Sequence, residues 1–126
     1  MISPLPLPPS ILVVDDDEES ANALASVLRV ELGCDVQTAY DGDEALQRAK
    51  ARRPDAVVID VHMPRMNGPE AAWLLRAAYP GMAPLMVALT GDRLPEAAAD
   101  DTLFDHQFQK PVPVEDLVQA LAECVE

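Results

Sequence analysis

Positive charge is scarce in this sequence. The 126 residues include only 9 lysines and arginines against 22 acidic residues, which gives a formal net charge of −13. A nucleic-acid-binding surface needs a basic stripe that neutralises phosphates, and docking on an anionic membrane needs clustered basic residues. The composition therefore predicts that this domain binds neither nucleic acid nor a membrane.

Cysteines and long apolar runs are also scarce. The two cysteines, Cys34 and Cys124, lack C-x-x-C spacing, so we expect buried or half-buried thiols in a reducing compartment. No apolar run reaches the roughly 18 residues that span a membrane. The N-terminus lacks the basic and apolar stretches of a secretion signal. These absences predict a cytoplasmic protein.

The length and apolar content predict one domain with a substantial core. Apolar residues make up 49% of the chain, which is not a disordered composition. Four prolines fall in residues 1–9, so this segment is expected to be an extended lead-in or linker. The folded domain is expected over residues 10–126. We expect it either to stand alone or to be part of a longer protein such as a hybrid kinase.

Short apolar runs alternate with segments of helical periodicity. Apolar residues in 18–32 recur three or four positions apart, as in an amphipathic helix. Asp41 and Glu44 have the spacing of a capping box, and Pro69 stands where a first helical turn accepts proline. The pattern predicts strands at 11–14, 34–39, 56–59, 85–89 and 107–109, and helices at 18–32, 41–53, 68–78, 95–100 and 114–125.

This alternation predicts an α/β fold with a doubly wound five-stranded parallel sheet. Right-handed crossovers between parallel strands place helices on both faces of the sheet. The strands at 11–14, 56–59 and 85–89 are apolar throughout, as strands covered on both faces must be. The two more polar strands should be edges. The strand order 2-1-3-4-5, the flavodoxin-like arrangement, satisfies that requirement.

Polar side chains follow four of the expected strands. Asp15 and Asp16 follow the first strand, Asp60 the third, Thr90 the fourth and Lys110 the fifth. Ligand sites in open α/β sheets lie at the carboxyl ends of the strands, so these groups should share one edge. Each has an ordinary alternative: an aspartate caps a helix, a threonine is structural, a lysine is solvated. Four coincidences at one edge are harder to explain.

The remaining acids of the run "DDDEES" have a simpler interpretation. Asp17, Glu18 and Glu19 are expected in the first turn of a helix, where the helix dipole favours negative charge.

The three carboxylates at the sheet edge favour a hard divalent cation. With no histidine or cysteine ligand among them, Mg²⁺ is the best match, and Mn²⁺ is possible. A cation also relieves the repulsion between the acids. Together with a lysine and a hydroxyl, this set is equipped for phosphoryl transfer, in which a carboxylate is the acceptor.

At this point the sequence resembles a known family. The motifs "VVDDD", "VVIDVHMPRMNG", "ALTG" and "FQKP" occur in the order, and at the strand ends, of the receiver domain of two-component response regulators. The resemblance covers about residues 10–126. It implies that Asp60 accepts a phosphoryl group from a phosphohistidine on a histidine kinase or histidine phosphotransfer protein, or from a small phosphodonor. The product would be an aspartyl phosphate that switches the conformation of the domain.

The resemblance also assigns roles to individual residues. Asp16 would bind the metal directly and Asp15 largely through water, with Asp60 and the backbone carbonyl of His62 as further ligands. Thr90 would be the switch hydroxyl, and Lys110 would pair with the phosphoryl group.

Two further assignments concern the backbone. Gly68 would let the loop after Asp60 turn into the next helix, and the Lys110–Pro111 bond would be cis, the geometry that only X-Pro bonds adopt cheaply.

Some positions depart from the family pattern or tune it. Gln107 stands where the family often has an aromatic residue or histidine, and of the nearby aromatics Phe108 is expected to face the core. The stretch between Thr90 and Lys110 is short, which predicts a clipped fourth helix. His62 and Asp92 would flank the path of the water that attacks the acyl phosphate. The phosphoryl half-life of His62→Ala tests that role.

Two other functions are compatible with parts of the pattern. Asp15 and Asp17 form a D-x-D after a strand, as in haloacid-dehalogenase-type phosphatases, but Asp100 and Asp101 precede Lys110 instead of following it. A degenerate receiver that only docks a partner would not need all five site residues. We therefore expect a switch with no independent metabolic substrate.

Overall fold

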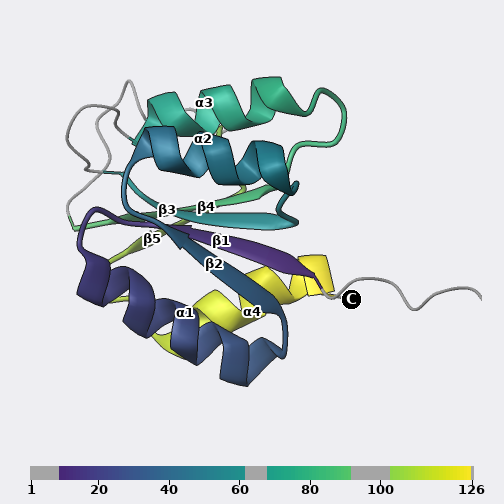
Figure 1. Ribbon diagram of the computed structural model, residues 1–126. Coiled ribbons are helices and arrows are strands. Elements are labelled where there is room, and N and C mark those ends of the chain that lie inside the picture. Colours follow the sequence, from purple (N-terminus) through teal and green to yellow (C-terminus); the bar gives the residue numbers. More distant parts are fainter. Residues whose placement is uncertain (1–8, 62–67, 92–102, 126) are drawn as a thin grey trace, which may run out of the picture.

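The structure is a computed structural model and describes residues 9–61, 68–91 and 103–125 (Figure 1). Within these residues the strands form one sheet and the helices pack on its two sides. No helix in the described part of the chain is long and apolar enough to cross a membrane.

The sheet confirms the expected topology. Its strands run parallel in the order β2-β1-β3-β4-β5. All residues of β1 and β3 are buried, whereas at the edges β2 has two buried residues and β5 has none, which is why the edge strands are the more polar ones. The bounds are β1 Ser10–Val14, β2 Asp35–Ala39, β3 Ala56–Asp60, β4 Leu85–Thr90 and β5 His106–Gln109.

The helices cover both faces of the sheet, also as expected. In Figure 1, α2 and α3 lie on one side and α1 and α4 on the other. The helix expected at 95–100 lies outside the described residues. The bounds of the four described helices are α1 Glu18–Leu32, α2 Gly42–Ala51, α3 Gly68–Ala78 and α4 Val114–Val125.

The start of α1 corrects one expectation. Asp17 is the N-cap and not part of the first turn: its carboxylate accepts hydrogen bonds from the Glu19 N–H at 3.2 Å and the Ser20 hydroxyl at 2.8 Å. These bonds satisfy a backbone donor that the helix leaves unpaired. The helix ends at Gly33, whose φ of 62° is the left-handed conformation that favours glycine.

The start of α2 uses the expected cap with one difference. The Asp41 carboxylate accepts the Glu44 N–H at 2.7 Å. The Glu44 carboxylate, however, accepts the N–H of Tyr40 at 3.1 Å, not that of Asp41. In the usual capping box the second carboxylate accepts the N–H of the N-cap residue itself. Here it accepts the N–H of the residue before the N-cap, so this bond links the segment after β2 to the first turn of α2.

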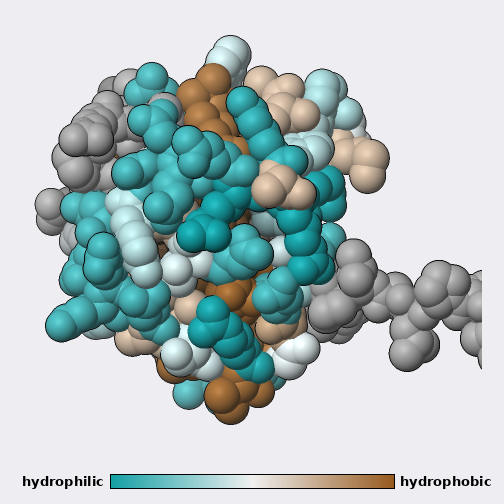
Figure 2. All heavy atoms as spheres, viewed as in Figure 1, coloured by the Kyte–Doolittle hydropathy of each residue, from teal (hydrophilic) through white to brown (hydrophobic). Residues whose placement is uncertain are grey.

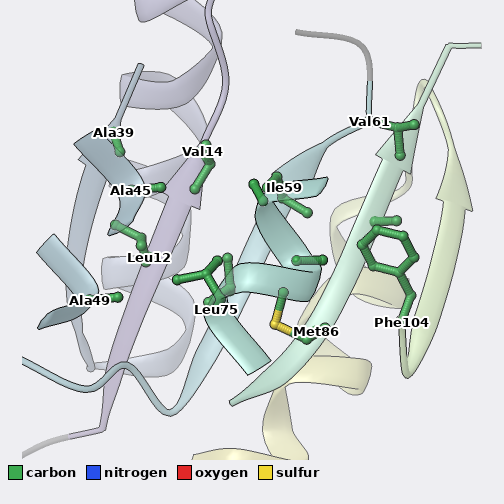
Figure 3. Packing of buried hydrophobic residues seen from close by; sticks show 14 residues of the cluster. Leu12, Val14, Ala39, Ala45, Ala49, Ile59, Val61, Leu75, Met86 and Phe104 are labelled. Carbon is green, nitrogen blue, oxygen red and sulfur yellow. The ribbon is translucent and has the colours of Figure 1, made fainter. Parts of the chain in front are cut away.

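The core has two layers, one on each face of the sheet. Along β1, Leu12 and Val14 point to the layer under α2 and α3, and Ile11 and Val13 to the layer under α1 and α4. Figure 3 shows the first layer. The helices contribute small residues that let them approach the sheet closely; these are Ala21, Ala25, Ala45, Ala49, Ala71 and Ala72.

The surface is mostly polar. Figure 2 shows hydrophilic side chains over most of one face, with apolar side chains between them. Among the described residues, the exposed large hydrophobic ones are Val30, Trp73, Met82 and Val114.

Two positions on α1 test the packing. Leu28 is fully buried, whereas Val30 is 83% exposed. Leu28→Ala removes buried methyl groups and leaves a cavity, so we expect it to lower the free energy of unfolding by about 2–5 kcal/mol. Val30→Ala should change it by less than about 0.5 kcal/mol. Urea unfolding of both variants checks this, and equal losses would contradict the assigned face of α1.

Candidate functional site

The sheet brings the expected polar groups to one edge. Asp15 follows β1, Asp60 ends β3, Thr90 ends β4 and Lys110 follows β5, and these four strands are neighbours in the sheet. Backbone bonds continue the pairing there: the Val61 N–H donates to the Leu89 carbonyl at 3.0 Å, and Lys110 N–H to the Thr90 carbonyl at 2.7 Å. Residues up to 95 positions apart in the sequence (110 − 15) therefore meet at this edge.

Three carboxylates form the centre of the site. One oxygen from each of Asp15, Asp16 and Asp60 lies within 4.8 Å of the others. Asp15 and Asp60 are buried, and Asp16 is exposed. An exposed carboxylate beside two buried ones leaves the site open to solvent on one side. Oxygen donors at this spacing fit a hard cation such as Mg²⁺.

Lys110 provides the positive charge of the site. Its Nζ atom lies 3.3 Å from Oδ2 of Asp60 and 3.7 Å from Oδ2 of Asp15. The lysine side chain is 37% exposed, whereas those of the two acids are only 10% and 11% exposed. The ammonium group contacts two of the three carboxylates, and the site keeps more carboxylates than ammonium groups. The Lys110–Pro111 bond is cis, as expected.

Burial raises the pKa of the Asp15 carboxyl group above its ordinary value. A hydrogen bond of 3.0 Å from the Asp17 N–H and the charge of Lys110 oppose this shift, while the charges of Asp60 and Asp16 add to it. The ionised Asp15 is therefore less stable here than in water. A divalent cation would relieve both the burial cost and the repulsion, which is a second reason why these residues fit Mg²⁺.

The raised pKa predicts a pH-dependent gain in stability when Asp15 is neutralised. Because the folded state holds this proton more tightly, the cost of ionising Asp15 is absent below a pH of about 4 and grows as the pH rises through the raised pKa. Asp15→Asn keeps the acceptor for the Asp17 N–H. We therefore expect it to melt above wild type at pH 7 without divalent metal, with the difference shrinking below pH 4.

The exposed acid Asp43 supplies the control for that measurement. Asp43→Asn removes one charge from the same chain without touching the site, so its melting temperature should stay near that of wild type at both pH values. A destabilised Asp15→Asn at pH 7 would show that the contact with Lys110 outweighs burial.

Of the other residues predicted for the site, three lie within the part of the chain that the structure describes and two do not. Thr90 is buried at the end of β4, beside the acids, and Gln107 is exposed on β5. Gly68 begins α3. His62 and Asp92 lie outside the described residues, so their expected roles stay predictions.

The structure adds contacts before β5 that sequence reasoning missed. The Asp105 carboxylate accepts the Met86 N–H at 2.8 Å and lies 3.4 Å from Arg76, which also donates to the Leu103 carbonyl at 2.9 Å. Phe104 is buried in the layer shown in Figure 3, whereas Phe108 is half-buried. An acid before a strand was the available signal, but nothing in the sequence identified its partners.

Comparison with known proteins identifies the family. The response regulator receiver domain family matches residues 11–122 of the chain. The chain belongs to this family. Receiver domains are the signalling switches of two-component systems, and they bind Mg²⁺ at an acidic pocket. The structure of this chain has a cluster of three aspartates.

Curated relatives include response regulators of mycobacteria. This receiver domain is 36% identical over 115 residues to the "Probable transcriptional regulatory protein TcrX" of Mycobacterium tuberculosis, which covers 90% of the chain and 48% of that protein. It is 39% identical over 113 residues to the response regulator MprA of Mycolicibacterium vanbaalenii, covering 89% and 48%. The chain thus spans about half the length of these relatives.

Solved structures agree with this fold. The response regulator protein TrrA of Thermotoga maritima, in complex with Mg(2+)-BeF, is 26% identical with a TM-score of 0.81, covering 92% of this receiver domain and 98% of that chain. The chemotaxis protein CheY4 of Vibrio cholerae is 29% identical with a TM-score of 0.82 and the same coverage.

Proposed function

We propose that this domain accepts a phosphoryl group on Asp60 from a phosphohistidine on a histidine kinase or histidine phosphotransfer protein. The proposal includes a dependence on Mg²⁺, cytoplasmic location and a role as conformational switch. The observation that carries it is the convergence of Asp60 with Lys110 and two further carboxylates at one sheet edge. A small phosphodonor could replace the phosphohistidine. Either donor would reach Asp60 from the solvent-exposed side of the site, where Asp16 lies.

The transfer needs one bond made and one broken. A carboxylate oxygen of Asp60 attacks the phosphorus atom while the phosphorus–nitrogen bond of the phosphohistidine breaks. The electron pair of that bond stays on the imidazole nitrogen, which takes up a proton from solvent if the ring is not already protonated. The product on this chain is an acyl phosphate.

Lys110 and Thr90 would stabilise the negative charge of the phosphoryl oxygens. The Lys110 ammonium lies 3.3 Å from Asp60 and so stands where it can pair with phosphoryl oxygens. The Thr90 hydroxyl, buried at the neighbouring strand end, would donate a hydrogen bond to one of them. Movement of Thr90 toward that oxygen would couple phosphorylation to the carboxyl end of β4.

The carboxylates would hold the metal. Asp15, Asp16 and Asp60, with the backbone carbonyl of His62, form the expected ligand set for Mg²⁺, with Asp16 the direct partner and Asp15 acting through water. When bound, the cation supplies positive charge against the phosphoryl oxygens and the acids. His62 and Asp92 would in addition modulate the lifetime of the acyl phosphate.

The phosphoryl-acceptor function fits this site better than a docking-only receiver or a phosphatase of the haloacid dehalogenase type does. A docking-only receiver would not need a lysine positioned 3.3 Å from a buried acceptor acid. A phosphatase of the haloacid dehalogenase type would turn over a generic phosphomonoester, and we expect no such turnover.

The direct test is phosphorylation from a small phosphodonor. The protein is incubated with Mg²⁺ and acetyl phosphate and then weighed by intact-mass spectrometry. We expect a gain of one phosphoryl group per chain. The gain should be absent when a chelator is added before the donor, and hydroxylamine should remove it after the reaction. No gain from acetyl phosphate and none from a panel of phosphohistidine donors would overturn the proposal.

A further inference from the structure

Asp16 differs from the other two carboxylates of the site in how its position is fixed. The Asp15 and Asp60 side chains both contact Lys110, whereas no hydrogen bond or ion pair links the Asp16 side chain to another residue that the structure describes. Asp16 is also exposed. The place of its carboxylate among the three therefore depends on the backbone of the short loop, residues 15–17, that connects β1 to α1.

The two elements that this loop connects are both held from the end of β2. At the start of the loop, the Asp15 N–H donates to the carbonyl of Ala39, the last residue of β2, at 3.1 Å. Beyond its end, Asn22 lies on α1, and its side-chain oxygen accepts a hydrogen bond of 3.0 Å from the Tyr40 hydroxyl. Ala39 and Tyr40 are adjacent in the chain, so one point of the structure holds both the end of β1 and the start of α1.

Tyr40 is itself fixed in three ways. Its side chain is partly buried and packs on the core layer under α1 and α4. Its N–H donates to the Glu44 carboxylate in the first turn of α2 at 3.1 Å, and its hydroxyl oxygen accepts a hydrogen bond of 3.4 Å from the Thr38 hydroxyl. A side chain held in this way can act as a brace, because movement of the start of α1 away from β2 would break the bond to Asn22.

We infer that Tyr40 is a positioning residue for Mg²⁺: its bond to Asn22 holds the loop 15–17 in the form that keeps the Asp16 carboxylate near the other two. The inference rests on the proposed Mg²⁺ binding and adds a residue outside the ligand set. Groups behind the ligands of a metal site raise its affinity by fixing the orientation of those ligands. The hydroxyl group of Tyr40 carries the effect, because the hydroxyl makes the hydrogen bond to α1.

The test measures Mg²⁺ binding to the unphosphorylated protein, so it needs no phosphodonor. Mg²⁺ is titrated into the ¹⁵N-labelled protein, and the amide signals of Asp16 and Asp17 are followed by NMR to give a dissociation constant. Tyr40→Phe removes one hydroxyl group and keeps the ring, so the core layer should stay intact. We expect this variant to bind Mg²⁺ about threefold more weakly than wild type, a loss within the range that one hydrogen bond contributes.

Tyr79→Phe is the matched control, because Tyr79 is the other of the two tyrosines in the chain. Its hydroxyl donates to the Ala49 carbonyl and links the segment after α3 to the last turn of α2. Both helices run back from the carboxyl ends of the strands, so this bond lies at the edge of the sheet opposite the acids. The variant loses a hydrogen bond of the same kind and should lose stability, but its dissociation constant for Mg²⁺ should stay within about 1.5-fold of wild type.

Asn22→Ala tests the same bond from its other side. Asn22 is exposed, so the change should not disturb the core. It should weaken Mg²⁺ binding about as much as Tyr40→Phe does, and the double variant should bind no more weakly than either single one, because each change removes the same bond. Independent losses that add up to about ninefold in the double variant would overturn the inference.

Two further results separate this inference from the proposed function. If wild type binds Mg²⁺ and Tyr40→Phe binds it equally well, or if Tyr79→Phe weakens binding as much as Tyr40→Phe does, the positioning role of Tyr40 is wrong while the proposed metal site stands. If Mg²⁺ moves neither the Asp16 nor the Asp17 signal in wild type, the proposed metal site is wrong and the role of Tyr40 is wrong with it.

Discussion

Asp60→Asn is expected to abolish phosphorylation by acetyl phosphate and Mg²⁺ to below the detection limit of intact-mass spectrometry. An amide oxygen is a poor nucleophile compared with a carboxylate, and its attack would not yield a stable acyl phosphate. The side chain is buried and lies 3.3 Å from Lys110. Asparagine has nearly the same shape, so the fold should survive the change.

The control for this variant is an acid outside the site. Asp43→Asn changes the same functional group in the first turn of α2, where the side chain is exposed. It should be phosphorylated at the wild-type rate. A mass gain in Asp60→Asn equal to that of wild type would mean that another residue is the acceptor.

The second large effect is expected from Asp16. Asp16→Ala removes one of the three carboxylates that lie within 4.8 Å of one another, and it should lower the apparent Mg²⁺ affinity of the reaction by about 10–100-fold. The rate of phosphorylation is measured as a function of Mg²⁺ concentration. At the concentration that half-saturates the wild type, the variant should be phosphorylated at less than about a fifth of the wild-type rate.

Glu19→Ala is the matched variant for this comparison. Glu19 belongs to the same run of five acids, but it lies in the first turn of α1, where its N–H donates to the Asp17 carboxylate. Its side chain has no expected role in the site, so the Mg²⁺ dependence should match that of wild type. If both variants shift the Mg²⁺ dependence equally, the run acts as a diffuse negative field, which contradicts a defined metal site.

The strand order could be predicted from the sequence because the polarity of each strand indicates whether it is buried on both faces. The three strands covered on both faces are apolar except for one polar residue at an end of each, and the two edge strands are mixed, which leaves few orders to choose from. Once the order is known, the residues after the strands must meet at one edge. The approach of Lys110 to Asp60, 50 positions away, follows from this geometry.

Other features depend on distances that no local pattern encodes. Asp17, Glu18 and Glu19 carry the same charge, so charge alone could not show that the first is the N-cap. Arg76 reaches Leu103 from 27 positions away, a contact that exists only once α3 is packed.

A groove lined by residues of β5 and α4 is a third case of this kind. It depends on the spacing between β5 and α4, which the alternation in "HQFQ" does not determine. In each of these cases tertiary packing, and not local sequence preference, decides the contact.

The cluster of carboxylates at this edge of the sheet lowers the stability of the folded protein, and the proposed function requires that cluster. Burial raises the pKa of Asp15, so its ionised form is less stable at this site than in water. A core of apolar residues at the same edge would be more stable but would bind no cation. Active sites commonly trade stability for such charge.

The most direct test of the account is the location of the phosphoryl group. The protein phosphorylated with acetyl phosphate and Mg²⁺ is reduced with borohydride, which converts an aspartyl phosphate to homoserine, then digested and sequenced by tandem mass spectrometry. We predict conversion at Asp60 and at no other aspartate. Conversion at Asp15 or Asp16, or phosphate found on a serine, threonine or histidine, would contradict the account.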